Sequence, residues 1–254
     1  MAGPERAPWP HGFLVAEEEL LGAEDAFALA GRLVDRAYGR GALEVLGDFV
    51  IPPADGSPTR DFQTLHFDFG LPVAPKVERD VALCTALYVS REACEVVAST
   101  RLVGLAELFG QRDWPERREL IARLARYGRT HGSWDEDGYT EGSLARVVEA
   151  AAGSAPALPA VRSEPGFLCG MEFDSLGSEL AFFDRHALPV EAATVEIPLR
   201  PGQLLLFDNL ALAHGRRGRR EPGELHQRVY GLKRAPVERQ RQLRDCVLGA
   251  FSAS

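Results

Sequence analysis

Two histidines and one aspartate have the types and spacing of a metal-binding set. His66 and Asp68 stand two residues apart, and His214 follows an apolar run 148 positions later. On an extended strand, residues i and i+2 project from the same face, so one imidazole and one carboxylate would lie side by side. A second imidazole from a distant strand would complete a facial triad of two histidines and one carboxylate. That ligand set suits non-haem Fe(II) and leaves coordination positions open for a cosubstrate and O2.

The pair at 66 and 68 is weak evidence by itself. The chain has 254 residues, with six histidines and 37 acidic residues. Such a composition makes roughly one His-x-Asp/Glu expected by chance. The metal hypothesis therefore depends on the elements that would carry the three residues.

Short apolar runs, separated by turn residues, predict a chain made mainly of strands. Strands are expected at 43–46, 49–51, 64–69, 81–89, 95–100, 166–173, 193–199, 203–207, 210–214 and 228–232. Helices are expected at 23–38, 102–109, 114–126, 143–152 and 237–248. A doubly wound sheet would need strands and helices to alternate throughout, and the C-terminal half does not alternate. The pattern favours a mainly β fold with flanking helices, a double-stranded β-helix of the jelly-roll or cupin type.

One domain is expected to span residues 1–254, with a helical insertion at about 114–163 between two sets of strands. Long excursions of this kind often cover active sites, so we expect the insertion to form a lid.

The most specific stretch runs from residue 201 to 216: a Pro-Gly turn, an apolar strand, Asp208-Asn209, and then His214 followed by Gly215-Arg216. It resembles the taurine dioxygenase and clavaminate synthase-like branch of the Fe(II)/2-oxoglutarate-dependent oxygenases. The resemblance covers residues 64 to 234, and its firm motifs lie at the two ends. It implies that His66, Asp68 and His214 bind Fe(II) as the catalytic centre, with 2-oxoglutarate and O2 as cosubstrates.

The family also has an arginine about 14 residues beyond the distal histidine, and Arg228 stands 14 residues after His214. The far carboxylate of 2-oxoglutarate needs a cation, and arginine offers a flat, permanently charged fork. The resemblance thus implies that Arg228 binds this carboxylate and that the hydroxyl of Thr100 lies beside it. Ser99 is the alternative hydroxyl and Arg234 the alternative arginine.

Three other groups near these motifs have different expectations. The arginines between 216 and 220 are expected at a solvated hairpin tip. His226 is two residues before Arg228, so it would share the same strand face and could hydrogen-bond to a ligand of the metal. His131, in the glycine-rich part of the insertion, is expected on the surface of the lid, with a substrate contact as the alternative.

Glu172 and Asp174 alternate with Met171 and Phe173, so one face of this strand would be acidic and the other apolar. Related amino-acid hydroxylases have an acidic strand here that contacts substrate. We expect these two carboxylates to bind a small substrate with a cationic group, an amino acid or a metabolite made from one. A strand whose acidic face meets solvent is an equally weighted alternative.

The resemblance implies hydroxylation of an unactivated C–H bond. Desaturation and cyclisation use the same ligands and stay open, whereas halogenases replace the carboxylate that Asp68 supplies here. A non-catalytic metal-binding jelly roll and a cupin-like Zn or Mn enzyme are the alternatives from other classes.

Bulk properties bound the partners. A net charge of −8 disfavours a nucleic-acid partner. No apolar stretch reaches 18 residues and no signal peptide is evident, so a membrane partner is not expected. The four cysteines lack metal-finger spacing and predict reduced thiols in a cytoplasmic protein. The oligomeric state is not predicted.

Overall fold

The computed structural model describes residues 9–16, 20, 22–51, 62–72, 77–91, 98–110, 118–119, 122–123, 142–152, 173, 175–218 and 225–250. Its strands form two five-stranded sheets in which every pairing is antiparallel. The first sheet has the order β1 (Phe13–Ala16), β8 (Leu204–Asp208), β4 (Arg79–Val89), β10 (Leu225–Ala235) and β2 (Glu44–Ile51). The second has the order β6 (Gly142–Ser143), β3 (Phe62–Phe67), β9 (Leu212–Arg217), β5 (Ser99–Gly104) and β7 (Thr194–Ile197).

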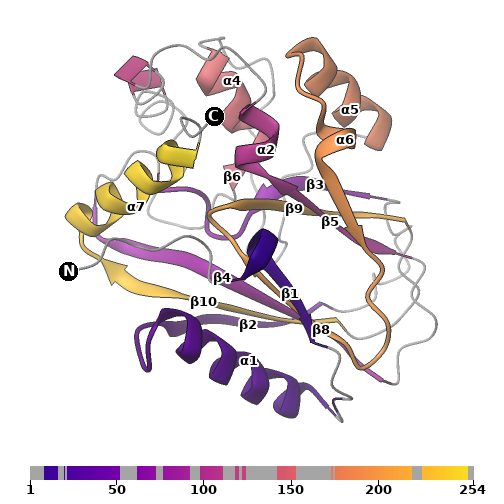
Figure 1. Cartoon of the computed structure of the whole chain (residues 1–254), viewed down its shortest axis with the longest axis vertical. Coiled ribbons are helices and arrows are strands. Elements are labelled where there is room, and N and C mark those ends of the chain that lie inside the picture. The colour runs from indigo at the N-terminus through magenta and orange to yellow at the C-terminus, as the bar shows by residue number, and fades with distance from the viewer. Residues whose placement is uncertain are drawn as a thin grey trace.

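This strand order is that of a double-stranded β-helix. Without the edge strands β1 and β6, the first sheet reads β2-β10-β4-β8 and the second reads β3-β9-β5-β7. The chain therefore crosses from one sheet to the other at nearly every connection, so two Greek keys wind into one jelly roll. The predicted mainly β fold of the jelly-roll type, with flanking helices, is confirmed by this topology (Figure 1).

Apolar side chains from both sheets meet between them. Inward-facing residues form one buried cluster: Leu87, Val89, Leu102, Ile197, Leu205, Phe207, Leu212 and Leu225. Successive strand residues point to opposite faces, so the residues between these face outward and need cover. Helices supply it on both sides, which places the sheets as the two central layers.

Helix α1 (Ala23–Tyr38) covers the first sheet, with Phe27 and Leu29 packed on Cys84, Ala86 and Tyr88. The second sheet is covered by α2 (Leu105–Phe109), α4 (Leu144–Ala152), α5 (Leu176–Arg185) and α6 (Val190–Ala193) (Figure 1). The short η1 (Pro10–Gly12) precedes β1, and α7 (Val237–Ala250) follows β10. Among the described residues no helix is long and apolar enough to cross a membrane.

Most expected elements are present, with three informative differences. Residues 102–104, expected to be helical, continue strand β5, because β5 pairs with both β7 and β9. The strand expected at 64–69 ends at Phe67, so Asp68 begins a turn. Helix α5 was not predicted, although Ser175 caps it through a hydrogen bond from the backbone N–H of Ser178.

The C-terminal part of the expected insertion belongs to the body of the fold. Strand β6 pairs with β3, opposite His66 and Phe67. Helix α4 buries Leu144 and Val148 in the cluster on the outer face of the second sheet. Strand β6 and helix α4 are thus part of the second sheet and of its outer cover. Most of residues 114–141 and 153–163, and therefore the predicted lid, lie outside the described residues.

Candidate metal centre

His66 on β3 and His214 on β9 stand directly opposite each other in the second sheet. Residues paired in this way have side chains on the same face, with Cβ atoms about 5 Å apart. The two imidazole centroids are 4.1 Å apart, and both residues are buried between the sheets. The antiparallel register thus brings together two histidines that are 148 positions apart in the chain.

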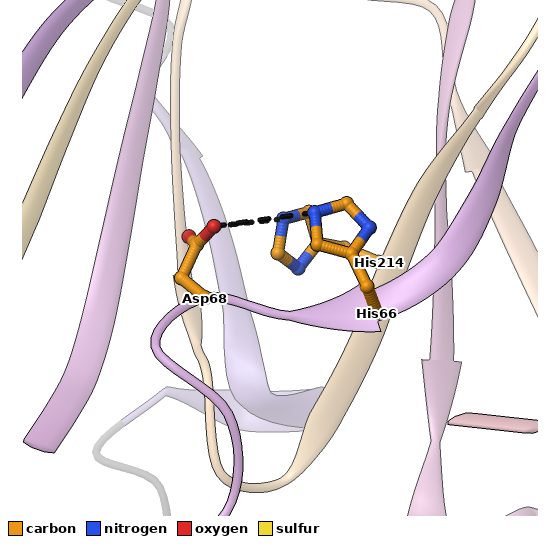
Figure 2. Close-up of side chains that lie close together, drawn as sticks. All are labelled: His66, Asp68 and His214. Atoms are coloured by element: carbon orange, nitrogen blue, oxygen red, sulfur yellow. Dashed lines mark ion pairs between the residues drawn. The ribbon is translucent and has the colours of Figure 1, made fainter. Parts of the chain in front are cut away.

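Asp68 reaches the same point from the turn after β3. Phe69 and Gly70 both have positive φ angles, 57° and 65°, which bends the chain away from the strand. One carboxylate oxygen of Asp68, Oδ1, lies 3.6 Å from Nε2 of His214 and 4.0 Å from Nε2 of His66. Figure 2 shows this carboxylate directed at the two imidazole rings. All three ligand atoms lie within 4.8 Å of one another.

The second carboxylate oxygen, Oδ2, is held from the opposite sheet. It accepts hydrogen bonds from the hydroxyl of Thr85 on β4 and from Nε2 of Gln227 on β10, the latter at 2.9 Å. Both donors are buried, with exposed fractions of 0% and 4%. Oδ2 is therefore occupied and Oδ1 is left directed at the imidazoles, which favours single-oxygen coordination.

The side-chain amide of Asn209 fixes the backbone of Asp68, because it bonds both the N–H and the carbonyl of that residue, as a paired strand would. Its side-chain oxygen accepts from the Asp68 N–H at 2.8 Å, and its Nδ2 donates to the Asp68 carbonyl at 2.8 Å. Asn209 is fully buried in the turn between β8 and β9. The turn that leads into the His214 strand is thus tied to the turn that carries Asp68.

The ring nitrogens of the two histidines are also distinguished. Nδ1 of His66 donates to the carbonyl of Thr64 at 2.8 Å, since a carbonyl can only accept. Its Nε2 is then the nitrogen that can bind a metal. Nδ1 of His214 is buried and makes no hydrogen bond within the described part of the chain. The ring of His214 packs against Phe207, with centroids 4.7 Å apart.

Burial shapes the charges of this centre. Desolvation raises the pKa of Asp68, although His66 and the hydrogen bonds from Thr85 and Gln227 act in the opposite direction. Desolvation, with a smaller effect of His66, lowers the pKa of His214 well below its usual value. His214 is therefore neutral near pH 7, as a metal ligand must be, and a bound dication would compensate the buried carboxylate.

The donor set fits a divalent transition metal. Ligand atoms in adjacent positions around a metal, each about 2.1 Å from it, lie about 3 Å apart. The separations of 3.6 and 4.0 Å from Asp68 Oδ1 exceed that value by an ångström or less. Two neutral imidazoles and one carboxylate oxygen on one side leave the other side open, which is the arrangement of non-haem Fe(II) centres.

Arg228 does not reach this centre. Gln227 faces inward to Asp68, so the next residue of β10 faces outward. Its guanidinium forms an ion pair with Asp48 on β2, and its Cζ lies 4.3 Å from the centroid of Phe27 in α1. The side chain thus lies on the outer face of the first sheet. The expectation that Arg228 binds 2-oxoglutarate is wrong for this geometry.

His226 is also turned outward, because its ring contacts Phe27 and Tyr88. The side chain of β10 that supports the metal ligands is Gln227 instead. Thr100, by contrast, lies on the inner face of β5, since its neighbour Arg101 points outward to Glu179 of α5. Arg234 has a positive φ and lies near the end of β10, where its N–H donates to Asp80.

The remaining expected residues fall outside this geometry. Glu172, Asp174 and His131 lie outside the described residues. Ser99 is on the outer face, where its hydroxyl donates to Glu196. Of the arginine cluster, Arg217 is exposed and pairs with Glu196, whereas Arg216 is half-buried.

Sequence reasoning missed four residues that hold the centre. Thr85 and Gln227 carried a faint signal as polar residues within apolar strands. Asn209 was noted only as part of a motif. Glu179 had no signal at all: it is fully buried in α5, accepts from the backbone N–H of Leu65 at 2.8 Å, and pairs with Arg101 at 2.6 Å.

No protein-family model matches this chain, and no curated protein matches its sequence. Solved structures similar to it include the PvcB protein from Pseudomonas aeruginosa, at 15% identity and a TM-score of 0.44 over 88% of this chain and 78% of that one. A putative alpha-ketoglutarate-dependent taurine dioxygenase from Burkholderia xenovorans has 12% identity and a TM-score of 0.41, over 92% and 85% of the two chains. An asparagine oxygenase with Fe(II), 2S,3S-3-hydroxyasparagine and succinate has 17% identity and a TM-score of 0.34, over 73% and 56%. Identity and TM-score are both low, so the function proposed below rests on the side chains of the site.

Proposed function

We propose that this chain is a non-haem Fe(II)- and 2-oxoglutarate-dependent oxygenase that oxidises a C–H bond of a small molecule. One observation carries the proposal: Nε2 of His66, Nε2 of His214 and Oδ1 of Asp68 converge inside a jelly roll, within 4.8 Å of one another. Ligands from one side leave positions for a bidentate cosubstrate and for O2. When bound, Fe(II) with 2-oxoglutarate supplies the oxidising chemistry.

The chain's own residues orient the ligands and keep water away. His66, Asp68 and His214 have exposed fractions of 3%, 2% and 5%, so the centre lies in a nearly dry interior. Thr85 and Gln227 fix the carboxylate plane through Oδ2, and Thr64 fixes the His66 tautomer. Because these partners are in place before a metal binds, little reorganisation is needed on binding.

We propose hydroxylation as the reaction, with an amino acid or an amino-acid-derived metabolite as substrate. Halogenation is not proposed, because halogenases lack the carboxylate ligand that Asp68 supplies here. The sequence alternation of Glu172 and Asp174 with apolar residues supports a substrate with a cationic group, because carboxylates directed into a pocket would favour an amine or guanidinium. Desaturation or cyclisation of such a substrate would use the same ligands.

A visible spectrum tests the cofactor assignment. Anaerobic addition of Fe(II) and 2-oxoglutarate should produce a weak metal-to-ligand charge-transfer band. Asp68→Ala should abolish the band, because the metal loses its charged ligand. Asp48→Ala removes an exposed carboxylate on the outer face and should keep the band. Folded wild-type protein without any band would contradict the proposal.

A second experiment addresses the reaction. Amino acids and their derivatives are incubated with Fe(II), 2-oxoglutarate and O2, and succinate is measured together with loss of the candidate substrate. Coupled succinate formation that requires His66, Asp68 and His214 supports an oxygenase. A protein that binds Zn(II) or Mn(II) tightly but gives neither the band nor succinate would be a metal-binding jelly roll of another function.

A further inference from the structure

A cavity of about 230 Å³ lies on the outer face of the second sheet, where helices α5 and α6 cover it. The two helices contact each other, and α6 also contacts β5 (Figure 1). The lining residues come from both helices and from the strands, and they include Arg101, Leu176, Leu180, Glu191, Glu196 and Arg217. Charged side chains of both signs therefore surround the cavity, beside two leucines.

The second sheet separates this cavity from the metal centre. Arg101 is followed on β5 by Leu102, which lies in the cluster between the sheets and stands opposite His214. Successive strand residues face opposite sides, so Arg101 faces outward. Glu196 on β7 stands directly opposite Arg101 and shares this outward face. A molecule in the cavity would thus lie across the sheet from the three candidate metal ligands.

Two of the charged lining residues compensate each other. Arg217 donates through Nη1 to Oε1 of Glu196 at 2.8 Å. The second carboxylate oxygen of Glu196 accepts from the hydroxyl of Ser99 at 3.1 Å. The hydrogen bond from Arg217 is also the main reason why the pKa of Glu196 is lowered. These two charges are therefore already paired with each other.

The other two charged residues, Arg101 and Glu191, have capacity left for a ligand. Arg101 is buried and donates through Nη1 to Glu179 at 2.6 Å, its one hydrogen bond to a described residue. A guanidinium has five N–H groups, so Arg101 keeps further donors. Glu191 is exposed, and its carboxylate makes no hydrogen bond or ion pair with any described residue. The cavity thus presents an arginine fork and a separate carboxylate.

A ligand that matches these two groups has a carboxylate and an ammonium group. Arginine binds carboxylates through its planar fork, and a carboxylate such as that of Glu191 binds an amine. Helix α5 begins at Leu176, so the positive end of its dipole also favours a negative group here. Leu176 and Leu180 suit an aliphatic body. The volume of about 230 Å³ is below the roughly 300–1,000 Å³ of sites for drug-sized ligands, so the ligand is smaller.

We propose that this outer cavity binds a small zwitterion with an aliphatic body, the chemical class of the aliphatic α-amino acids. Its carboxylate binds Arg101 and its ammonium group binds Glu191. The site is a second one, because the sheet lies between it and the metal centre and none of its lining residues is a candidate metal ligand. The inference goes beyond the proposed oxygenase function and does not rest on it.

Calorimetry with three matched ligands tests the charge requirement. L-Valine carries both groups, isobutylamine is the same molecule without the carboxylate, and 3-methylbutanoate is the same molecule without the ammonium group. L-Valine should bind with a dissociation constant of about 1 mM or below, through two charged contacts. The other two should bind at least about tenfold more weakly, because each leaves one charged group of the cavity without a partner. Absence of saturable L-valine binding in folded wild type overturns the inference.

Substitutions locate the bound molecule. Glu191→Gln should weaken L-valine by about tenfold and leave 3-methylbutanoate within about twofold, because only the ammonium contact is lost. Arg101→Lys keeps a charge for Glu179 but loses the fork, so it should weaken both ligands by about tenfold. The control is Glu238→Gln, another exposed glutamate in the first turn of a helix, which should leave every affinity unchanged. If Arg101→Lys does not fold, Glu191→Gln decides, and unchanged L-valine binding in that variant overturns the inference.

The metal separates this site from the metal centre. L-Valine should bind metal-free protein, Mn(II)-loaded protein and the Asp68→Ala variant with affinities equal to within about twofold, because the sheet lies between the two sites. Binding that needs the metal or Asp68 would place L-valine at the metal centre as a substrate. That result overturns the inference and leaves the oxygenase proposal standing. Conversely, metal-independent binding that needs Glu191, in a protein without the charge-transfer band, supports the inference while the oxygenase proposal fails.

Discussion

Gln227 donates a hydrogen bond of 2.9 Å to Oδ2 of Asp68, from the opposite sheet and from 159 positions further along the chain. This contact joins the two layers of the jelly roll at the metal centre. It also fixes the alternation of β10, since Gln227 inward requires Arg228 outward. The orientation of one buried amide therefore turns Arg228 away from the metal centre.

Gln227→Leu should lower metal affinity by about 10–100-fold, the usual effect of losing a hydrogen bond to a metal ligand. The leucine has nearly the same size, so the interior stays filled while Oδ2 keeps only the Thr85 hydroxyl. Competition with a chromophoric chelator measures the affinity. The control is Gln240→Leu, an equally buried amide that binds the carbonyls of Val77 and Ala235. This control should lose stability but keep metal affinity, and equal affinity in both variants would contradict the assigned role of Gln227.

Glu179 links helix α5 to strand β3 immediately beside His66. The register of β3 against β9 shifts between Gln63 and His66, and the Leu65 N–H in that bulge is donated to Glu179. The other carboxylate oxygen of Glu179 pairs with Arg101, which is 2% exposed. Glu179→Ala should cost about 3–5 kcal/mol, because it leaves a buried arginine without its counter-charge.

Urea unfolding measures that cost, and a double variant separates its two parts. Arg101→Met combined with Glu179→Leu removes both charges, so it should recover most of the lost stability. The Leu65 N–H stays without an acceptor in the double variant. We therefore expect recovered stability with weakened metal binding, since the bulge that aims His66 is no longer held. Metal affinity equal to that of wild type would show that Glu179 supports the fold alone.

The sequence predicted most of the described strands, and it predicted that His66, Asp68 and His214 lie together, because the signals for both are local. His66 and Asp68 lie in one short run, and the Asp208-Asn209 turn precedes His214 in another. Arg228 was assigned by counting from His214, yet a count along the chain does not fix which face of β10 a residue occupies. That face depends on register with β4 and β2, including a shift at Val229 and Tyr230. The pairing of β10 with these two distant strands therefore determines which face Arg228 occupies.

The role of Glu179 also could not be predicted from the sequence, because its partners are distant in the chain. Glutamate in a helix normally indicates a solvated face, and nothing near it in sequence marks it as buried. Its counter-charge, Arg101, lies 78 positions earlier, and the backbone group it binds lies 114 positions earlier. Only the assembled layers bring these three groups together. The residues that support the centre can thus be found only in the folded structure, whereas its candidate ligands form a motif in the sequence.

Gly215 lies between His214 and Arg216 and has no room for a side chain. A Cβ atom there would lie 2.6 Å from the carbonyl oxygen of Gln63 and 3.2 Å from that of Thr64. Gly215→Ala should therefore force β9 away from β3 and destabilise the protein by about 1–3 kcal/mol. Gly31→Ala is the matched control in α1, where a Cβ meets nothing within 4 Å. That control should stabilise the helix by about 0.5–1 kcal/mol, and chemical denaturation compares the two.

Asp208 gives a pH-dependent prediction at the turn between β8 and β9. Its Oδ1 accepts from the N–H groups of Leu210 and Ala211 at 2.8 and 2.9 Å. Burial nevertheless raises the pKa of Asp208 to about 6, from 3.8 in the unfolded chain. Because the folded state binds this proton more tightly, the contribution of Asp208 to the free energy of unfolding is largest below pH 4 and is lost as pH rises from about 4 to 6.

Asp208→Asn keeps an acceptor oxygen and never acquires the charge. At pH 8 it should be more stable than wild type by about 1 kcal/mol, a value discounted because Asp208 retains some contact with water. Near pH 4 the difference should vanish. Tyr38 and Cys84, the nearby titratable groups, stay neutral in this range because burial raises the pKa of both. Urea unfolding of the metal-free proteins between pH 4 and 8 measures this difference in stability. Asp208→Ala is the control: it lacks the acceptor oxygen, so it should be less stable than Asp208→Asn at every pH. A constant difference between wild type and Asp208→Asn would show that this carboxylate does not titrate in that range.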